Sequence, residues 1–410
     1  MEAPPRTARL VLVSPGGEVL GTLPPVPVAS PWWQDIAPVV EAVRRHHGVE
    51  VTILRLLEGQ RAAPPGGEVT YVAEVDGPVD AAPFEGALAD HPLRAAYARP
   101  GGPAADLAWA REVLAGRGLE FTAPPAQIRT WNLSSLWRLR TQAGPAWLKV
   151  LPAFIAREAR LLAYLAEERV PVLLGGAGQR VLMADIAGRD LYGATSAEIL
   201  EMVDLLVDLQ ARRIGRESEL LALGLADWRA PALIAAIRSV IERAAGDLEA
   251  GELAMLQRFA DDLPRRMEAV AACGLSHTLI HGDFQGGNVR GESGALTLID
   301  WGEGGVGHPL LDQAAMFENI AADQVAPVRA HWADRWRQAV PGSDPMAGFA
   351  LLRPVAVAKQ AAVYQGFLDN IEPSEHPYHR ADPAERLKRT AALLRAEASS
   401  TLENDLGASR

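Results

Sequence analysis

Three polar residues at the ends of short apolar runs constrain this chain more than any other feature. Asp283 follows the apolar run 278–280 closely, and Asn288 lies five residues after it. Asp300 directly follows a second run at 296–299, which reads Leu-Thr-Leu-Ile. Short apolar runs bounded by Gly, Asn and Asp are typical of buried strands that end in loops. We therefore expect two strand ends that bring three oxygen-bearing side chains to one place.

This arrangement suits phosphoryl transfer from a nucleotide. One carboxylate can orient or deprotonate an attacking hydroxyl, while an Asn and an Asp hold Mg²⁺ on the phosphates. The pattern assigns Asp283 as the base or orienting group, and Asn288 and Asp300 as metal ligands. An isolated Asp-Gly or Gly-Asn pair usually marks an ordinary turn, so the interpretation depends on the joint spacing of the three residues.

The spacing resembles the catalytic loop of protein kinases, in which an Asp is followed by an Asn at the fifth position and later by a metal-binding Asp. Here Gly282 stands where protein kinases have Arg, and Trp301 follows the second Asp where they have Phe-Gly. The chain is more similar to the aminoglycoside phosphotransferase family, whose signature reads His-Gly-Asp, Asn five residues later, then Ile-Asp-Trp. The resemblance covers roughly residues 125–400.

The resemblance implies an α+β, bilobal, protein-kinase-like fold, with a small β-rich N-lobe at 125–187 and a large helical C-lobe at 188–410. Lys149 lies in the apolar strand Trp-Leu-Lys-Val, where an unpaired charge would be costly. Glu158, on an expected helix at 154–166, is the implied partner. Together they would present the ammonium to the nucleotide phosphates.

Two further nucleotide contacts are implied by position. The loop at 132–135 replaces the Gly-rich loop of protein kinases but contains no Gly. The hydroxyls of Ser134 and Ser135, with loop N–H groups, could hold phosphate oxygens; the alternative is a plain hairpin with a polar tip. Adenine would bond to the backbone of Ala184 and Ile186, at the hinge between the lobes.

Other residues of the C-lobe have structural interpretations. His281 is expected to tie the catalytic loop to the metal-binding strand, and Asp312 could cap the following helix. His308 stands where the family commonly has the Asp of a Gly-Asp-Pro sequence. The loop before the last helix carries three acidic side chains and one histidine that could face a cationic substrate, although a solvated loop is the simpler interpretation: Asp369, Glu372, Glu375 and His376.

Residues 1–100 are expected to form a separate small α/β domain. Two apolar runs flank the hairpin signal Ser-Pro-Gly-Gly at 14–17, and a helix at 36–47 precedes two more strands. The order faintly resembles a Nudix domain, but the Glu cluster that holds metal there is missing. Because that cluster is missing, we expect residues 1–100 to be a catalytically inactive docking or capping domain. Residues 101–124 would supply a linker and one helix.

Length and composition agree with this organisation. A chain of 410 residues is too long for one core, so two or three domains are expected. The net charge of −11 argues against nucleic-acid binding. A single cysteine, Cys273, excludes a disulfide within the chain and suits the cytoplasm. Neither a signal peptide nor a membrane span is expected.

The sequence thus predicts an ATP- and Mg²⁺-dependent phosphotransferase, with GTP as an alternative donor, acting on a hydroxyl of a soluble small molecule. An aminoglycoside-like antibiotic, an amino alcohol and a sugar are the candidate acceptors. The alternative is a nucleotide-binding regulatory or pseudokinase module without turnover, which the Gly-free loop favours and the complete metal-binding pattern disfavours. A Nudix-type hydrolase is disfavoured by the missing Glu cluster. Neither the acceptor nor the oligomeric state follows from the sequence.

Overall fold

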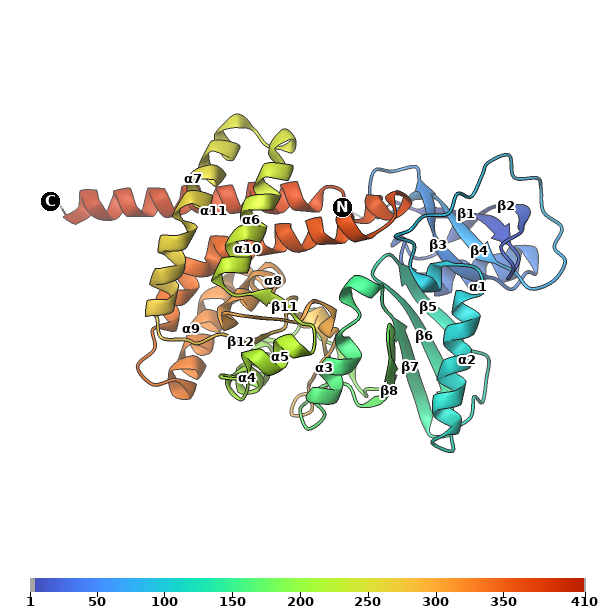
Figure 1. The fold of residues 1–410 in the computed structure, drawn as a ribbon, viewed down its shortest axis with the longest axis horizontal. Helices are drawn as coiled ribbons and strands as arrows, with labels where there is room; N and C mark the ends of the chain where they lie inside the picture. The colour runs from blue at the N-terminus through green and yellow to red at the C-terminus, as the bar shows by residue number, and fades with distance from the viewer. Residues whose placement is uncertain (1–3, 409–410) are drawn as a thin grey trace. The chain divides into compact units, whose positions relative to one another are not determined.

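The computed structural model describes the backbone of residues 4–408 and the side chains of residues 4–399, with elements labelled in Figure 1. Residues 1–3, part of the segment in which no signal peptide is expected, lie outside the described residues. The chain divides into two units. Unit 1 comprises Met1–Ala159, Val172–Asp185 and Phe367–Arg380; unit 2 comprises Arg160–Pro171, Ile186–Gly366 and Ala381–Arg410.

The N-terminal part of unit 1 is a four-stranded sheet with one helix. The sheet order is β2-β1-β4-β3, in which only β1 and β4 pair in parallel. The order along the chain is strand, strand, helix, strand, strand, as the sequence predicts. Its elements are β1 (Arg6–Val13), β2 (Val19–Val28), α1 (Ala37–His47), β3 (Thr52–Gly59) and β4 (Gly67–Glu74).

The core of this domain follows the two-residue period of β1. Ala8, Leu10 and Leu12 point to one face and are buried against Ile36 and Val39. Helix α1 ends at Gly48, whose φ of 69° is left-handed; glycine adopts this conformation without strain.

A five-stranded antiparallel sheet follows, with the order β5-β6-β7-β9-β8. One face is covered by α2 (Gly102–Ala115), the helix expected after the Pro-Gly-rich linker. Leu114 of α2 packs in one buried cluster with Trp137 and Leu148 of the sheet. The strands are β5 (Ala126–Trp131), β6 (Ser134–Thr141), β7 (Gly144–Val150), β8 (Leu173–Ala177) and β9 (Arg180–Ala184).

Within unit 1 the N-terminal domain is bonded to β5, the edge strand of this sheet. The side chain of Gln127 accepts the Ile53 N–H at 2.9 Å and donates to the Ile53 carbonyl at 2.6 Å. The N–H of Ile36 donates to the Ile128 carbonyl at 3.1 Å. The first hundred residues therefore satisfy an edge that would otherwise be open.

Segment 367–380 also belongs to unit 1, whereas the sequence placed it in the C-lobe. Its turn of 3₁₀-helix, η7 (Pro373–Tyr378), packs against β3, and the Tyr378 ring lies edge-on to those of Trp33 and Trp131. Short helices η1 (Ala96–Ala98) and η2 (Ala153–Ile155) and the start of α3 (Glu158–Tyr164) complete the unit.

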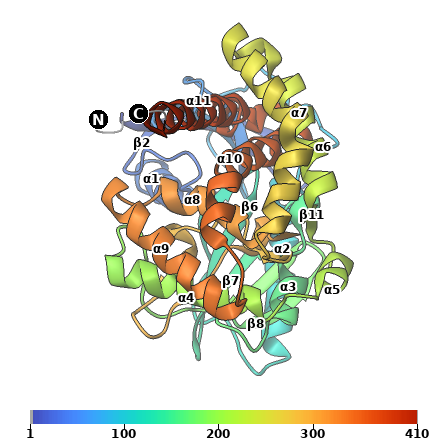
Figure 2. The ribbon, with the colours of Figure 1, turned by 90° about the vertical axis from the view of Figure 1, so that its left-hand side faces the viewer.

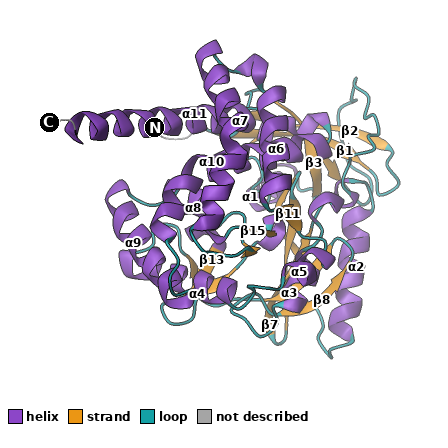
Figure 3. Ribbon diagram, turned by 60° about the vertical axis from the view of Figure 1, so that its left-hand side comes forward, coloured by secondary structure: helices purple, strands orange, loops and turns teal. Residues whose placement is uncertain are grey.

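Unit 2 is mainly helical. Figure 2 shows α6 beside α7 and α4 beside α9, and Figure 3 shows the short strands among these helices. The α-helices are α4 (Ser196–Ala211), α5 (Glu217–Ala222), α6 (Ala230–Arg243), α7 (Ala250–Ala272), α8 (Gln313–Glu318), α9 (Ala322–Ala339), α10 (Pro345–Asn370, whose last residues belong to unit 1) and α11 (Asp382–Ala408).

Two small sheets in unit 2 carry the predicted catalytic residues. Their orders are β11-β15-β12 and β10-β13-β14. The strands are β10 (Arg189–Asp190), β11 (Ala226–Trp228), β12 (Thr278–Ile280), β13 (Val289–Gly291), β14 (Thr297–Leu298) and β15 (Gly305–Gly307), and the 3₁₀ turns are η3 (Ala245–Asp247), η4 (Gly286–Asn288), η5 (Trp301–Glu303) and η6 (Pro309–Asp312).

Among the described residues, one helix is long and apolar enough to cross a membrane by length and composition, although no span was expected. This helix is α10, and 56% of its most apolar stretch is buried within the structure. A core helix of a soluble protein passes the same test, so the finding is weak evidence for a membrane span.

Candidate active site

The predicted base and one predicted metal ligand touch each other. The Asn288 Nδ2 group donates to the Asp283 Oδ2 atom at 2.7 Å and to the Asp283 carbonyl at 2.8 Å. Asn288 ends the η4 turn, directly before β13. The amide therefore fixes the orientation of the Asp283 carboxylate and leaves the amide oxygen, Oδ1, for other partners.

The second predicted metal ligand is joined to the same loop by strand pairing. The Ile299 N–H donates to the Asn288 carbonyl at 2.9 Å, in line with the antiparallel pair β13 and β14. Asp300 follows with φ of 61°, the one positive φ of a non-glycine residue in the part of the chain described here. This conformation costs about 1 kcal/mol or more, and such strain is concentrated at functional sites.

The donor set fits Mg²⁺ rather than a metal caged by protein. Among residues 4–399, no group of three or more His, Cys, Asp or Glu side chains could hold a metal ion. Mg²⁺ usually takes one or two protein oxygens and completes its octahedron with phosphates and water. The Asn288 amide and the Asp300 carboxylate, the two predicted metal ligands, would supply that number.

The predicted role of His281 is confirmed. Its Nε2 atom bonds to the Ile299 carbonyl at 2.9 Å, which ties the catalytic loop to the metal-binding strand. Since a carbonyl only accepts, Nε2 carries the proton. The imidazole is buried and its centroid lies 4.5 Å from that of Trp301. His281 is thus a structural residue beneath the site, as are Trp301 and Phe284, both completely buried.

Asp312 supports the catalytic loop, whereas the sequence suggested that it could cap the following helix. Its side chain makes no capping bond to α8. Instead Asp312 accepts from the N–H of His281 at 2.9 Å, from that of Gly282 at 2.8 Å and from Gln210 Nε2 at 2.8 Å. Burial raises the pKa of Asp312, and these donors oppose that rise.

The position directly before the candidate base Asp283 requires glycine for a steric reason. Gly282 has φ of 94°, and a Cβ atom there would lie 2.4 Å from the Glu303 carbonyl oxygen. The arginine that protein kinases carry at this position would not fit. His308, in place of the family's Asp, accepts the Leu310 N–H on Nδ1 at 3.3 Å. Burial lowers the pKa of His308 to about 3, so its imidazole is neutral.

The predicted ion pair of the N-lobe is present in unit 1. Lys149 Nζ on β7 lies 2.6 Å from the Glu158 Oε2 atom at the start of α3, and the Glu158 side chain is 1% exposed. Lys149 is held by pairing on both sides, opposite Leu136 and Val181. A buried pair of this geometry fixes the direction in which the ammonium points.

The hydroxyls of the Gly-free loop are engaged inside unit 1. Ser134 Oγ accepts from the Trp131 indole at 3.2 Å, and Ser135 Oγ accepts from the Trp137 indole at 3.0 Å. Both serines are buried. In these two bonds the serine oxygens accept, so each hydroxyl still has its O–H to donate.

The two predicted hinge residues, Ala184 and Ile186, each use a backbone group in a hydrogen bond. The Ala184 N–H, at the end of β9, donates to the Val172 carbonyl at 3.0 Å. The Ile186 carbonyl accepts from Arg290 Nε at 2.8 Å. The Ala184 N–H and the Ile186 carbonyl are therefore already bonded, and any adenine contact would fall to other backbone groups of this segment.

Two acidic residues before α11 are not solvated, whereas Asp369 is exposed. Glu372 and Glu375 are buried in unit 1, and Glu372 pairs with Arg94 at 2.8 Å and with Arg55 at 3.4 Å. The expectation of a solvated loop is wrong for these two residues because arginines distant in sequence neutralise Glu372. Pairing over such separations leaves no local sequence signal.

Sequence analysis missed Lys359 on α10. It is 1% exposed, its ammonium lies 5.1 Å from the centroid of the Trp228 ring, and burial lowers its pKa. The nearby carboxylates of Glu303, Asp312 and Asp283 oppose that shift. The rarity of lysine could have revealed this residue. Only three of the 40 residues that are Lys or Arg are lysines, and Lys359 is the one lysine of its apolar helix.

Comparison with known proteins identifies the family of this chain. The model of the family described as "Phosphotransferase enzyme family" (APH) matches residues 126–349, more than half of the chain. The chain belongs to this family. The phosphotransferase has no significant match among curated proteins. The family match confirms the resemblance to aminoglycoside phosphotransferases, and the protein is a small-molecule kinase.

Among the three solved structures described here, the choline kinase shows the same fold. The choline kinase from Cryptosporidium parvum Iowa II is 11% identical, with 74% of this phosphotransferase and 97% of that chain covered and a TM-score of 0.52. A macrolide 2′-phosphotransferase type I is 18% identical, with coverage of 71% and 97% and a TM-score of 0.49. A choline/ethanolamine kinase family protein from Mesorhizobium loti is 16% identical, with coverage of 70% and 94% and a TM-score of 0.47. At such identities the likeness concerns the fold alone.

Proposed function

We propose that this phosphotransferase moves the γ-phosphate of ATP to a hydroxyl of a soluble small molecule in the cytoplasm. The observation that supports it best is the contact between Asn288 and Asp283, with Asp300 joined to the same loop through Ile299. A base and two metal ligands, held on two segments that strand pairing joins, are the groups that phosphoryl transfer requires.

Each residue has a defined task in this proposal. The Asp283 carboxylate orients the acceptor hydroxyl and takes its proton, with little base strength needed because the transition state is loose. Asn288 Oδ1 and the Asp300 carboxylate hold Mg²⁺, which when bound neutralises phosphate charge. Lys149, oriented by Glu158, binds phosphate oxygens.

For the loop at 132–135, we propose phosphate contact through the hydroxyls of Ser134 and Ser135 and through loop N–H groups. Both hydroxyls accept bonds from tryptophan indoles and keep an O–H to donate. A turn can bind an anion through successive N–H groups without side-chain help. Adenine would bond to the backbone near Ala184 and Ile186; GTP remains the alternative donor.

The acceptor is a hydroxyl of an aminoglycoside-like antibiotic, another antibiotic, an amino alcohol or a sugar. The structural neighbours are named as macrolide phosphotransferase and choline kinases, so both chemical classes belong in a test. Pocket shape selects the acceptor, and fold alone does not.

A nucleotide-binding regulatory module without turnover is the second candidate. The absence of Gly from the loop at 132–135 favours it, because glycine lets the backbone approach phosphates closely. The complete set of base and metal ligands favours the kinase.

Transfer of labelled γ-phosphate with Mg²⁺ to aminoglycosides, macrolides, amino alcohols and sugars tests the proposal. Asp283→Asn should lower turnover by about 10²–10⁴-fold while nucleotide affinity stays close to that of wild type. Asp261→Asn, an exposed carboxylate on α7, is the matched control. Normal turnover by Asp283→Asn would overturn the mechanism, and nucleotide binding without transfer to any acceptor would favour the regulatory module.

A further inference from the structure

The β5–β6 hairpin closes with a turn that hairpins of its length do not favour. Trp131 pairs with Ser134, so two residues, Asn132 and Leu133, form the turn. Two-residue hairpins usually take turns with a positive φ, because other turns splay the two strands. Neither Asn132 nor Leu133 has a positive φ. The conformation of this turn therefore depends on contacts from outside the hairpin.

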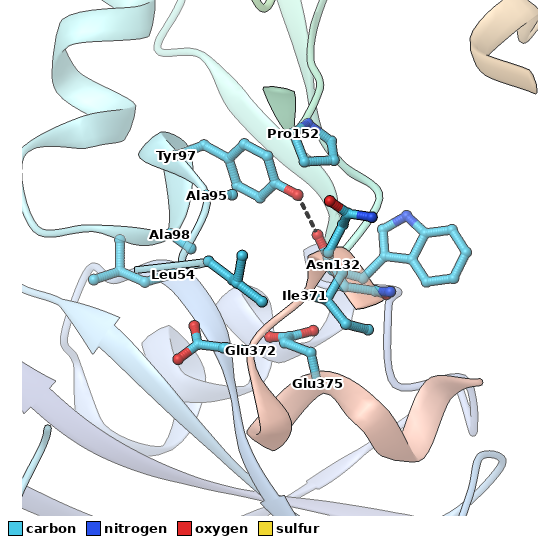
Figure 4. Close-up of a pocket in the computed structure, with 12 residues that line it drawn as sticks. Leu54, Ala95, Tyr97, Ala98, Asn132, Pro152, Ile371, Glu372 and Glu375 are labelled. Carbon is cyan, nitrogen blue, oxygen red and sulfur yellow. Dashed lines mark hydrogen bonds between the residues drawn. The ribbon is translucent and has the colours of Figure 1, made fainter. Parts of the chain in front are cut away.

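Tyr97 supplies the first of these contacts. Its hydroxyl donates to the Trp131 carbonyl at 2.7 Å, and the residue is 2% exposed. Figure 4 shows this bond as a dashed line, with Asn132 beside it and Glu375 below. Tyr97 lies on η1, between the N-terminal domain and α2. The bond fixes the carbonyl of the peptide group that leads into the turn.

The segment that carries η7 supplies the second set of contacts. The Glu375 carboxyl accepts the Leu56 N–H of β3 at 2.8 Å and also takes the N–H of Asn132. The Tyr378 ring lies edge-on to the Trp131 ring, with centroids 5.6 Å apart. The peptide group between Trp131 and Asn132 is thus held at both its carbonyl and its N–H.

The N-terminal domain also holds the strand that leads into the turn. The Thr130 N–H donates to the Gln34 carbonyl at 3.2 Å, and the two bonds between Gln127 and Ile53 hold the start of β5. Because β5 is an edge strand, these bonds take the place of a missing neighbour strand. The position of the turn therefore depends on the first hundred residues of the chain.

Trp131 passes this restraint to a predicted phosphate contact. Its indole N–H donates to the Ser134 Oγ atom at 3.2 Å. An indole only donates, so the Ser134 oxygen accepts and its own hydrogen points elsewhere. The bond therefore limits the directions in which the Ser134 hydroxyl can donate.

We propose that Trp131 is a positioning residue for the nucleotide phosphates, and that Tyr97 and Glu375 fix its place. The N-terminal domain is then a brace for a loop that has no glycine. Such a loop reaches phosphates through a hydroxyl whose direction is set from behind, whereas a glycine loop brings its backbone close. The inference rests on the proposed function, because it requires phosphate contact at the loop at 132–135.

Nucleotide binding to the full chain tests this role. Titration calorimetry measures the affinities for ATP with Mg²⁺ and for adenosine, which has no phosphates. Trp131→Phe keeps an aromatic ring but loses the indole donor, and Tyr97→Phe loses the hydroxyl. Each should weaken ATP binding about tenfold and change adenosine affinity by less than about twofold. A general loss of fold would weaken the binding of both ligands alike.

Two control variants separate positioning from stability. Tyr71→Phe removes a buried hydroxyl that donates to the Trp33 carbonyl, also at 2.7 Å, inside the N-terminal domain. Trp32→Phe changes a tryptophan that is 48% exposed. Both controls should bind ATP like wild type. In thermal unfolding, Tyr71→Phe should lose about as much stability as Tyr97→Phe, because the two bonds are alike.

A double-variant cycle tests whether Trp131 acts through Ser134. Ser134→Ala alone should weaken ATP binding about tenfold, because the hydroxyl itself is gone. Adding Trp131→Phe should weaken binding little further, since two residues that act through one contact are not additive.

Several results would overturn the inference while leaving the proposed function intact. In a wild type that binds ATP, these are unchanged ATP affinity in either Trp131→Phe or Tyr97→Phe, an equal loss of adenosine affinity, and fully additive losses in the cycle. A wild type that binds no ATP would overturn the proposed function and this inference with it.

Discussion

Asp312 accepts the backbone N–H of His281 at 2.9 Å, and through this bond a residue remote in sequence sets the position of the candidate base. The same carboxylate takes the next N–H, of Gly282, so the two peptide groups before Asp283 share one anchor. Charge-assisted bonds of this kind are about twice as strong as neutral ones. The catalytic loop is thus held from below by a group with no role in chemistry.

Asp312→Asn should therefore reduce both stability and turnover. In the variant, the side-chain oxygen can accept from one of the two backbone N–H groups, of His281 or Gly282. The side-chain NH₂ group then faces the other N–H, so the free energy of unfolding should fall by about 2–4 kcal/mol. Urea unfolding and kcat measure the two effects. Asp334→Asn, which disrupts only an exposed pair with Arg337, is the control. An unchanged kcat in Asp312→Asn would contradict the anchoring role.

Lys149→Met should separate stability from activity. Removal of the ammonium leaves the buried Glu158 carboxylate without this partner, which should cost about 3–5 kcal/mol of unfolding free energy. Adding Glu158→Gln should recover much of that stability but none of the lost activity, because nucleotide phosphates still lack their cation. Nucleotide KM and chemical unfolding are the measurements. Recovery of activity in the double variant would refute the phosphate-binding role.

Lys359→Met should lower turnover with little loss of fold. The buried ammonium lies among the carboxylates of Glu303, Asp312 and Asp283, so its removal changes the field at the base. A decrease in kcat of about 10–100-fold is expected, as for other groups that orient an active site. The control is Lys388→Met, at an exposed position.

The pH profile tests Lys359 further. Burial lowers its pKa from the ordinary value of 10.5, so the wild type should lose activity on the alkaline side as the ammonium deprotonates. The Met variant has no proton to lose there and should lack that limb. If both enzymes show the same alkaline limb, Lys359 is only a packing residue.

Glu375→Gln should change the pH dependence of stability. The pKa of Glu375 in the folded protein, about 8, lies above the ordinary value of 4.5, so the fold favours the protonated carboxyl. This stabilisation is fully present below pH 4.5 and is lost as the pH rises to about 8. The variant should lose less unfolding free energy over this window, by up to about 1.4 kcal/mol per pH unit. Urea unfolding at several pH values measures this. Parallel curves for the two proteins would show that Glu375 is ionised in the fold throughout.

The catalytic pattern could be predicted because its parts are close in sequence. Asp283, Asn288 and Asp300 fall within 18 residues, and strand pairing of β13 with β14 adds only a hairpin to join them. The Lys149–Glu158 pair could also be predicted, because the two residues lie only nine positions apart, on a strand and on the helix that follows it. In both cases local structure fixes the geometry.

The sequence by itself determined the order of elements in the N-terminal domain and the position of the candidate catalytic loop, because periodicity and turn residues act over short distances. Only the tertiary structure decided which carboxylate anchors that loop, that Lys359 faces it, and that Glu375 meets Leu56, 319 positions away. Those contacts depend on burial. The free energy of a buried charge or amide is set by the groups that packing places beside it, and no local pattern records them.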